Sequence, residues 1–200
     1  IYRSLMFPGQ LYYSMVNDQL TVSTSLKNIL QNRRNKINNK ALELYMNLRF
    51  IPSPYTIIEE VFKLENGYLL TFNGEEIEKK QITIKTQSLI NGDIKEVGLH
   101  IVDAVKRSNN KVDNLGIFLS GGFDSAIIAS ILINNHKKIK AFSVGYEVET
   151  TFDETNIAKN IAKDLNIEHS IYKIQNSELL NLFNEAVDIL EEPFYSTVSV

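Results

Sequence analysis

The fold class is decided by the stretch Leu115-Gly116-Ile117-Phe118-Leu119-Ser120-Gly121-Gly122-Phe123-Asp124-Ser125-Ala126. Its first five residues form an apolar run, which predicts a buried strand of a parallel sheet. The apolar residues 126–133 that follow predict a helix. A strand, a glycine-containing turn and a helix in this order predict an α/β protein.

The turn between this strand and this helix has the chemistry of a phosphate site. Gly121 and Gly122 allow a tight turn whose N–H groups approach phosphate oxygens, and the helix directs its positive end at the same anion. Ser120 and Ser125 supply hydroxyl donors, and Asp124 supplies a carboxylate that can hold Mg²⁺. A simple helix-capping turn is the alternative, but it explains only one or two of these residues.

The turn differs from two common phosphate motifs. The kinase-type loop requires a lysine that this sequence lacks at the corresponding position, and the dinucleotide pattern G-x-G-x-x-G is absent. The string S-G-G-x-D-S instead resembles the pyrophosphate loop (PP-loop) of the adenine nucleotide α-hydrolase group. Those enzymes cleave ATP between its α and β phosphates.

Composition excludes several classes of protein. The chain has 200 residues, of which 44% are hydrophobic and 22% charged, as in ordinary globular proteins. It contains no cysteine, which rules out disulfides, thiolate zinc sites and a thiol nucleophile within these residues. The net charge of −3 gives no electrostatic case for nucleic acid, and no apolar stretch is long enough for a membrane span. We therefore expect a cytoplasmic enzyme that binds neither nucleic acid nor membrane.

Two patterns of elements meet near residue 87. The first part predicts two hairpins, one around Asn17-Asp18 and one around Asn73-Gly74, with strands at 11–16, 19–23, 67–72 and 81–85. It also predicts a helix at 40–49, which Asn38-Asn39 can cap and whose apolar residues Leu42, Tyr45 and Met46 share one face. The second part alternates helices and strands, which predicts a parallel sheet with right-handed crossovers. Its strands are expected at 115–119, 139–144 and 169–174, and its helices from about 94 and at 124–134, 154–165 and 177–190.

The order of these landmarks resembles the asparagine synthetase family of glutamine-dependent, ATP-consuming enzymes. Landmarks shared with that family lie at residues 11–13, 21–27, 51–57, 62–70, 118–125, 141–146, 152–158 and 190–193. The resemblance implies that residues 1–87 are the C-terminal part of a class II glutamine amidotransferase domain plus a connecting segment. It implies that residues 88–200 are the N-terminal part of a PP-loop synthetase domain.

The resemblance also implies a two-step amide synthesis. ATP would activate a substrate carboxylate, such as that of aspartate, as an acyl-adenylate with loss of pyrophosphate, and ammonia from glutamine would then displace AMP. By position, the phosphates would be held by Ser120, Gly121, Gly122, Asp124 and Ser125, with Asp124 as a Mg²⁺ ligand. The backbone of Leu119 and Val144 would contact the adenosine. The implied cofactors are ATP and Mg²⁺, the implied partners are small-molecule substrates, and a homodimer is left open.

Several family features lie outside this sequence. The glutaminase cysteine is absent, and the chain ends at Val200 before a second glycine-rich acidic segment and a lysine. Because the sequence also begins with Ile1, we expect a fragment that binds ATP weakly, does not turn over, and leaves the strand at 115–119 as an open edge. Two alternatives stay open: a relative that forms β-lactams or cyclic peptides by the same adenylation, and a non-catalytic nucleotide-binding module.

The remaining charged residues favour structural roles. The three histidines, His100, His136 and His169, lack the spacing of metal ligands and are expected at the surface or in packing contacts. The pair Asp153-Glu154 is expected to cap the helix that follows it. The pair Glu191-Glu192 is expected to be a solvated helix end, with a role beside the substrate as the alternative.

Overall fold

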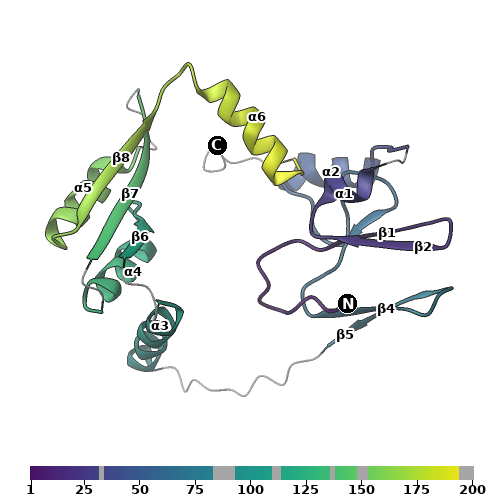
Figure 1. The fold of residues 1–200 in the computed structure, drawn as a ribbon, viewed down its shortest axis with the longest axis horizontal. Helices are drawn as coiled ribbons and strands as arrows, with labels where there is room; N and C mark the ends of the chain where they lie inside the picture. Colours follow the sequence, from purple (N-terminus) through teal and green to yellow (C-terminus); the bar gives the residue numbers. More distant parts are fainter. Residues whose placement is uncertain (32–33, 83–92, 110–113, 136–137, 148–152, 194–200) are drawn as a thin grey trace. The chain divides into compact units, whose positions relative to one another are not determined.

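The computed structural model describes residues 1–31, 34–82, 93–109, 114–135, 138–147 and 153–193, and it divides the chain into two units (Figure 1). One unit comprises residues Ile1–Lys85 together with Leu180–Val200, and the other comprises Thr86–Leu179. The expected border near residue 87 falls among residues 83–92, outside the described residues.

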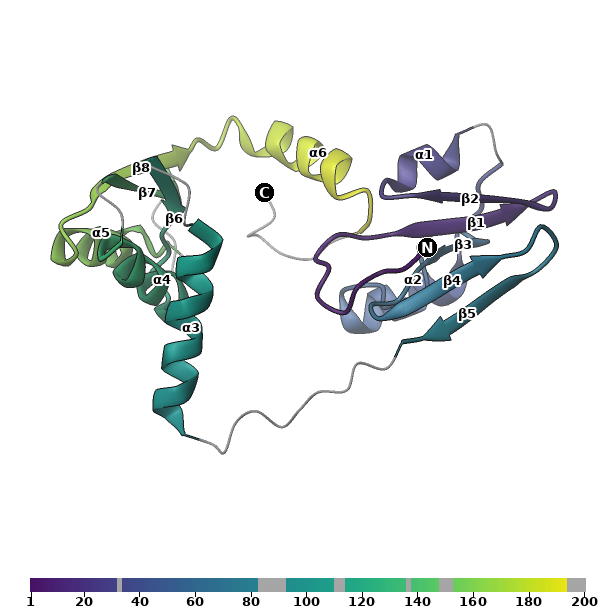
Figure 2. The ribbon, with the colours of Figure 1, turned by 60° about the horizontal axis from the view of Figure 1, so that its bottom comes forward.

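The first unit is rich in antiparallel strands, as expected (Figure 2). Strands β1 (Tyr12–Val16), β2 (Gln19–Ser23) and β3 (Val61–Lys63) form a sheet in the order β2-β1-β3. The predicted hairpin at Asn17-Asp18 is confirmed. Both turn residues have positive φ, at 50° and 59°, a conformation that asparagine and aspartate tolerate in two-residue hairpin turns.

The second hairpin is present, but its second strand begins earlier than predicted. Strand β4 (Tyr68–Phe72) pairs with β5 (Ile77–Gln81) in antiparallel register, with Phe72 opposite Ile77. The side chain of Asn73 accepts hydrogen bonds from the N–H groups of Glu75 and Glu76, at 2.9 and 2.7 Å. These bonds close the turn within residues 73–76, so β5 begins directly after it at Ile77 and not at residue 81.

Three helices accompany these sheets: α1 (Leu26–Leu30), α2 (Asn39–Leu48) and α6 (Leu179–Leu190). Asn38 caps α2 as predicted, since its side chain accepts from the N–H of Ala41 at 3.1 Å. Ala41 is the fully buried residue of α2, whereas Leu42 and Met46, from the apolar face noted in the sequence, are exposed. Helix α1 was not predicted. Its Leu26 and Ile29 are buried with Tyr12 of β1 and Val61 of β3.

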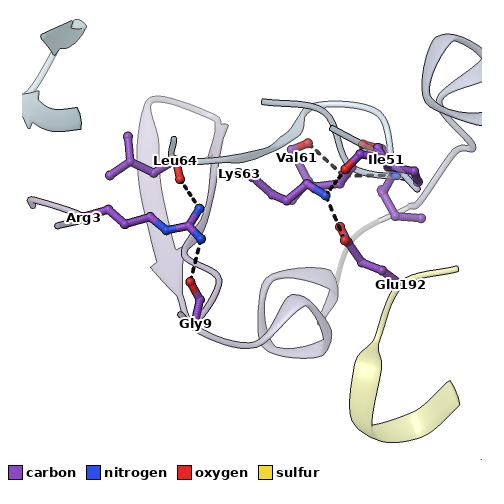
Figure 3. Close-up of polar contacts among 9 residues, drawn as sticks. Arg3, Gly9, Ile51, Val61, Lys63, Leu64 and Glu192 are labelled. Atoms are coloured by element: carbon purple, nitrogen blue, oxygen red, sulfur yellow. Dashed lines mark hydrogen bonds and ion pairs between the residues drawn. The ribbon is translucent and has the colours of Figure 1, made fainter. Parts of the chain in front are cut away.

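Buried cations hold the loops of this unit (Figure 3). The guanidinium of Arg3 donates to the carbonyl oxygens of Leu64 and Gly9, at 2.6 and 2.7 Å. The ammonium of Lys63 donates to the carbonyl of Ile51 at 2.7 Å and lies 2.8 Å from a carboxylate oxygen of Glu192. Glu192 is therefore not part of a solvated helix end, and that prediction was wrong.

The carboxylate of Glu191 is also engaged. It accepts from the hydroxyl of Ser25 at 2.6 Å and from the N–H of Leu26, at the start of α1. A negative charge is stabilised there by the unpaired N–H groups of the first helical turn. The two glutamates thus bind the end of α6 to α1 and β3.

The second unit has the predicted parallel sheet, in the order β6-β7-β8. The strands are β6 (Asn114–Phe118), β7 (Lys138–Tyr146) and β8 (Glu168–Ile174), and the helices are α3 (Ile94–Asn109), α4 (Phe123–Ile133) and α5 (Thr155–Asp164). Among the described strands, β6 lies at an edge, as expected. The α/β fold class with a β-rich preceding part is confirmed.

Small residues bring the helices close to one face of this sheet. The buried core consists of Leu119, Ala129 of α4, Ala141 of β7, and Ala158 and Ala162 of α5. The helical spacing of apolar residues in 154–165 predicts that Ile157 is buried with Ala158 and Ala162, but it is 53% exposed. The other face of the sheet carries exposed apolar side chains, among them Phe118, Phe142, Val144 and Tyr172.

Candidate phosphate-binding loop

The residue before the loop is fixed inside the second unit. Leu119 is buried, its N–H donates to the carbonyl of Phe142 at 2.8 Å, and its carbonyl accepts from the hydroxyl of Ser143 at 2.5 Å. Both backbone groups are therefore in use, although a carbonyl oxygen has a second lone pair. That lone pair is what Leu119 still offers to a ligand.

A histidine on the neighbouring strand supports this anchor. His169 Nε2 lies 2.7 Å from the hydroxyl oxygen of Ser143. Because a hydroxyl has one hydrogen, and Ser143 donates it to Leu119, the Nε2–H of His169 donates to Ser143. Burial lowers the pKa of His169, and Lys159 acts in the same direction. His169 is thus a packing histidine as expected, but its link to the loop was not predicted.

The two loop serines bind each other and the loop backbone. Their hydroxyl oxygens are 2.9 Å apart. The Ser125 hydroxyl accepts from the N–H of Ser120 at 3.1 Å, and the Ser120 hydroxyl accepts from the N–H of Gly122 at 3.1 Å. These bonds hold the turn in shape from within.

Gly121 lies directly against the start of α5. A Cβ added at this position would be 3.1 Å from both the Cβ of Glu154 and the Cβ of Ile157, which is closer than most Cβ contacts and would push these neighbours away. The N–H of Gly121 donates to a carboxylate oxygen of Glu154 at 3.0 Å. The predicted capping role of Glu154 is wrong, since its side chain makes no capping bond to α5.

The other acid of that pair does act at the helix start. Asp153 accepts from the N–H and the hydroxyl of Thr155, at 2.9 and 2.6 Å. These bonds lower the pKa of Asp153. Gly145 lies beside them, where a Cβ would be 2.6 Å from the methyl carbon of Thr155. The start of α5 is therefore packed tightly against the end of β7.

Asp124 stands in the first turn of α4, whose N-cap is Gly122. Asp124 and its neighbour Phe123 are exposed. The first N–H groups of a helix have no carbonyl partner within that helix, so they are available to an anion. An exposed carboxylate, two hydroxyls and these N–H groups fit a magnesium-bound polyphosphate, because Mg²⁺ takes both carboxylate and phosphate oxygens as ligands.

Val144, the second expected adenosine contact, lies in β7 opposite Tyr172 of β8 and is 54% exposed. It thus faces solvent on the open side of the sheet. A cavity of about 850 Å³ lies at the other end of these strands, where Asn114, Lys138 and Glu168 begin them. Parallel sheets bind ligands at the carboxyl ends, so this cavity is not the candidate site.

Within the described residues, no three acidic or histidine side chains gather as a metal site. His100 lies 3.9 Å from Glu96 on the exposed side of α3, and His136 lies outside the described residues. None of the described helices is both long and apolar enough to cross a membrane.

Together, a parallel sheet and a glycine-serine turn at the carboxyl end of its edge strand define an α/β protein of the PP-loop type. The family model described as asparagine synthase matches residues 96–200, and the one described as glutamine amidotransferase domain matches residues 7–83. The chain belongs to the asparagine synthase family, and the resemblance inferred from the sequence is confirmed.

Individual relatives agree with this assignment. Asparagine synthetase [glutamine-hydrolyzing] 1 of Bacillus subtilis is 31% identical over 200 residues, which cover 95% of this chain and 31% of the relative. A relative from Methanocaldococcus jannaschii is 32% identical over 200 residues, covering 92% of this chain and 38% of that protein. The chain thus spans about a third of the length of these curated relatives.

Solved structures show more distant likeness. NMN synthetase from Francisella tularensis is 26% identical, with a TM-score of 0.38 over 48% of this chain and 40% of that one. Glutamine-dependent NAD+ synthetase from Acinetobacter baumannii is 15% identical, with a TM-score of 0.40 over 72% of this chain and 27% of that one.

Proposed function

We propose that this chain supplies the ATP-binding loop of an ATP-dependent ligase that converts a carboxylic acid into an amide. The observation that carries the proposal is the Ser120–Ser125 turn, which brings N–H and hydroxyl groups and the exposed carboxylate of Asp124 to the carboxyl end of a parallel strand. In this proposal residues 1–87 complete a glutamine amidotransferase domain, and residues 88–200 begin the synthetase domain. The separate family matches on either side of residues 84–95 support that division.

Each loop residue has a proposed part in binding. The N–H groups of the glycine turn and of the first turn of α4 hydrogen-bond phosphate oxygens, together with the hydroxyls of Ser120 and Ser125. The second lone pair of the Leu119 carbonyl and the backbone of Val144 would contact the adenosine at the carboxyl ends of the strands. Asp124 holds Mg²⁺, which neutralises the charge of the phosphates that leave as pyrophosphate.

The proposed substrates follow from the relatives. The B. subtilis relative is named as a glutamine-hydrolysing asparagine synthetase, so aspartate is the proposed acid and glutamine the proposed source of ammonia. The reaction then requires small molecules as its partners. We propose that it takes place in the cytoplasm. Relatives that form β-lactams or cyclic peptides share the adenylation step, and they differ in the acid that they activate.

Isotope exchange tests this function. The full-length protein that contains this sequence is incubated with ATP, Mg²⁺ and labelled pyrophosphate, with and without aspartate. We expect label to enter ATP only when aspartate is present. Asp124→Asn should abolish the exchange, while Asp164→Asn, at the exposed end of α5, should retain it. Exchange that is independent of every carboxylic acid would contradict the proposal. The 200-residue chain alone is expected to bind ATP without turnover.

A further inference from the structure

One N–H donor of the proposed phosphate loop already forms a hydrogen bond to a carboxylate of the protein. Glu154 Oε2 accepts from the N–H of Gly121 at 3.0 Å. Glu154 stands just before α5, yet its side chain makes no bond to the N–H groups of that helix. The neighbouring Asp153 takes the helical N–H of Thr155 instead. The Glu154 carboxylate is therefore directed at the loop rather than at its own helix.

The close packing of Gly121 makes this contact part of the loop's shape. Gly121 has so little space that an added Cβ would be 3.1 Å from the Cβ atoms of Glu154 and Ile157. Since the two backbones approach this closely, the glutamate side chain needs no extended conformation to reach the N–H. The side chain itself is exposed, so it is able to move away into solvent.

An amide N–H of such a loop cannot make full hydrogen bonds to a carboxylate and a phosphate at the same time. The carboxylate and the phosphate are both anions that accept from the same N–H, and their negative charges repel each other. We propose that Glu154 is an internal competitor, which occupies the Gly121 N–H when no nucleotide is bound and weakens the hold of the loop on phosphates. This inference rests on the proposed function, because it assumes that the loop binds pyrophosphate.

Such competition has a consequence for turnover. A loop that binds pyrophosphate too tightly would retain its product, whereas a carboxylate ready to return to Gly121 speeds the release. Glu154 is then a positioning residue that sets the affinity of the loop, without contact to the reacting atoms.

Calorimetric titration of the 200-residue chain with magnesium and inorganic pyrophosphate tests the inference. The variants are Glu154→Ala, which removes the acceptor, and Glu154→Gln, which keeps the shape and removes the charge. Glu168→Ala and Glu168→Gln are matched controls, because Glu168 lies at the amino end of β8. We expect Glu154→Ala to bind pyrophosphate about three- to tenfold more tightly than the parent, Glu154→Gln to fall between, and the controls to match the parent.

A second readout does not depend on a ligand. Without pyrophosphate, hydrogen exchange of the Gly121 N–H should be faster in Glu154→Ala than in the parent and in Glu168→Ala. Equal or weaker pyrophosphate binding by both Glu154 variants, with a parent that binds, overturns the competition and leaves the proposed function standing. If neither the parent nor any variant binds pyrophosphate, the proposed function falls, and this inference falls with it.

Discussion

The ammonium of Lys63 lies 2.8 Å from the carboxylate of Glu192, a residue 129 positions later in the sequence (Figure 3). The side chains are 3% and 17% exposed, so the pair is largely removed from water. One oxygen of Glu192 has no hydrogen-bond partner among the described residues. Within the first unit, the segment after α6 is therefore held to β3 by a buried charge pair.

Removing one member of this pair should be costly. We expect Lys63→Met to lower the free energy of unfolding by about 3 kcal/mol, because it leaves the Glu192 carboxylate buried without its cation. Urea denaturation measures the change. Lys27→Met is the matched control, since Lys27 and Asp188 form an exposed pair whose loss should cost less than about 1 kcal/mol. Equal losses in both variants would show that the Lys63 pair is not buried in solution.

The titration of Glu192 should appear in the pH dependence of stability. Burial raises the pKa of Glu192 above its ordinary value of 4.5, although the Lys63 ammonium opposes this. The folded state therefore holds the proton more strongly than the unfolded chain. The stability contributed by Glu192 is complete below about pH 4.5 and is lost as the pH rises through the raised pKa. The unfolding free energy of the parent minus that of Glu192→Gln should fall over this range, and a difference that rises would refute the direction.

Ser143 should be important for the anchor of the loop. Ser143→Ala removes the donor to the Leu119 carbonyl and the acceptor for His169, so we expect a loss of about 1–3 kcal/mol in unfolding free energy. Ser130→Ala is the control, because the Ser130 hydroxyl only donates to Ile127 within α4, and its removal should cost below about 0.5 kcal/mol. Thermal or urea unfolding distinguishes the two, and a neutral Ser143→Ala would argue against the anchor.

Two glycines should respond to alanine in opposite directions. Gly98 lies within α3 with nothing inside 4 Å of an added Cβ, so Gly98→Ala should stabilise the chain by about 0.5–1 kcal/mol. Gly121→Ala should destabilise the chain and weaken nucleotide binding, because its Cβ would press on Glu154 and Ile157. Unfolding curves and ATP titration of both variants check this, and a well-bound nucleotide in Gly121→Ala would contradict the tight packing.

Much of this fold follows from local sequence signals. The apolar run before Ser120 and the glycine pair after it predict β6, the loop and α4 within one or two residues of their observed bounds. Asn17-Asp18 and Asn38 likewise predict a turn and a cap, since these side chains satisfy nearby backbone groups. Such signals are readable because both partners lie within a few residues of each other.

What sequence reasoning missed depends on contacts between distant residues. The link from His169 through Ser143 to Leu119 requires the register of three strands, and the burial of Glu192 requires Lys63 of a strand that was not predicted. The Glu154–Gly121 contact joins residues 33 positions apart. No spacing rule within one element reveals these pairs. The pair Asp153-Glu154 gave a partial signal. Capping a helix needs one carboxylate, so the second carboxylate of the pair was free for another partner.

The proposed function requires that the turn from Ser120 to Ser125 binds the phosphates of ATP, with Asp124 as a Mg²⁺ ligand. Calorimetric titration with ATP, in the presence and absence of Mg²⁺, tests it most directly on the parent, Asp124→Asn and the control Asp164→Asn. We predict that Mg²⁺ tightens ATP binding in the parent and in Asp164→Asn, and that Asp124→Asn loses this gain. An equal gain from Mg²⁺ in all three proteins, or no ATP binding by the parent, would show that this turn is not the magnesium-dependent ATP site.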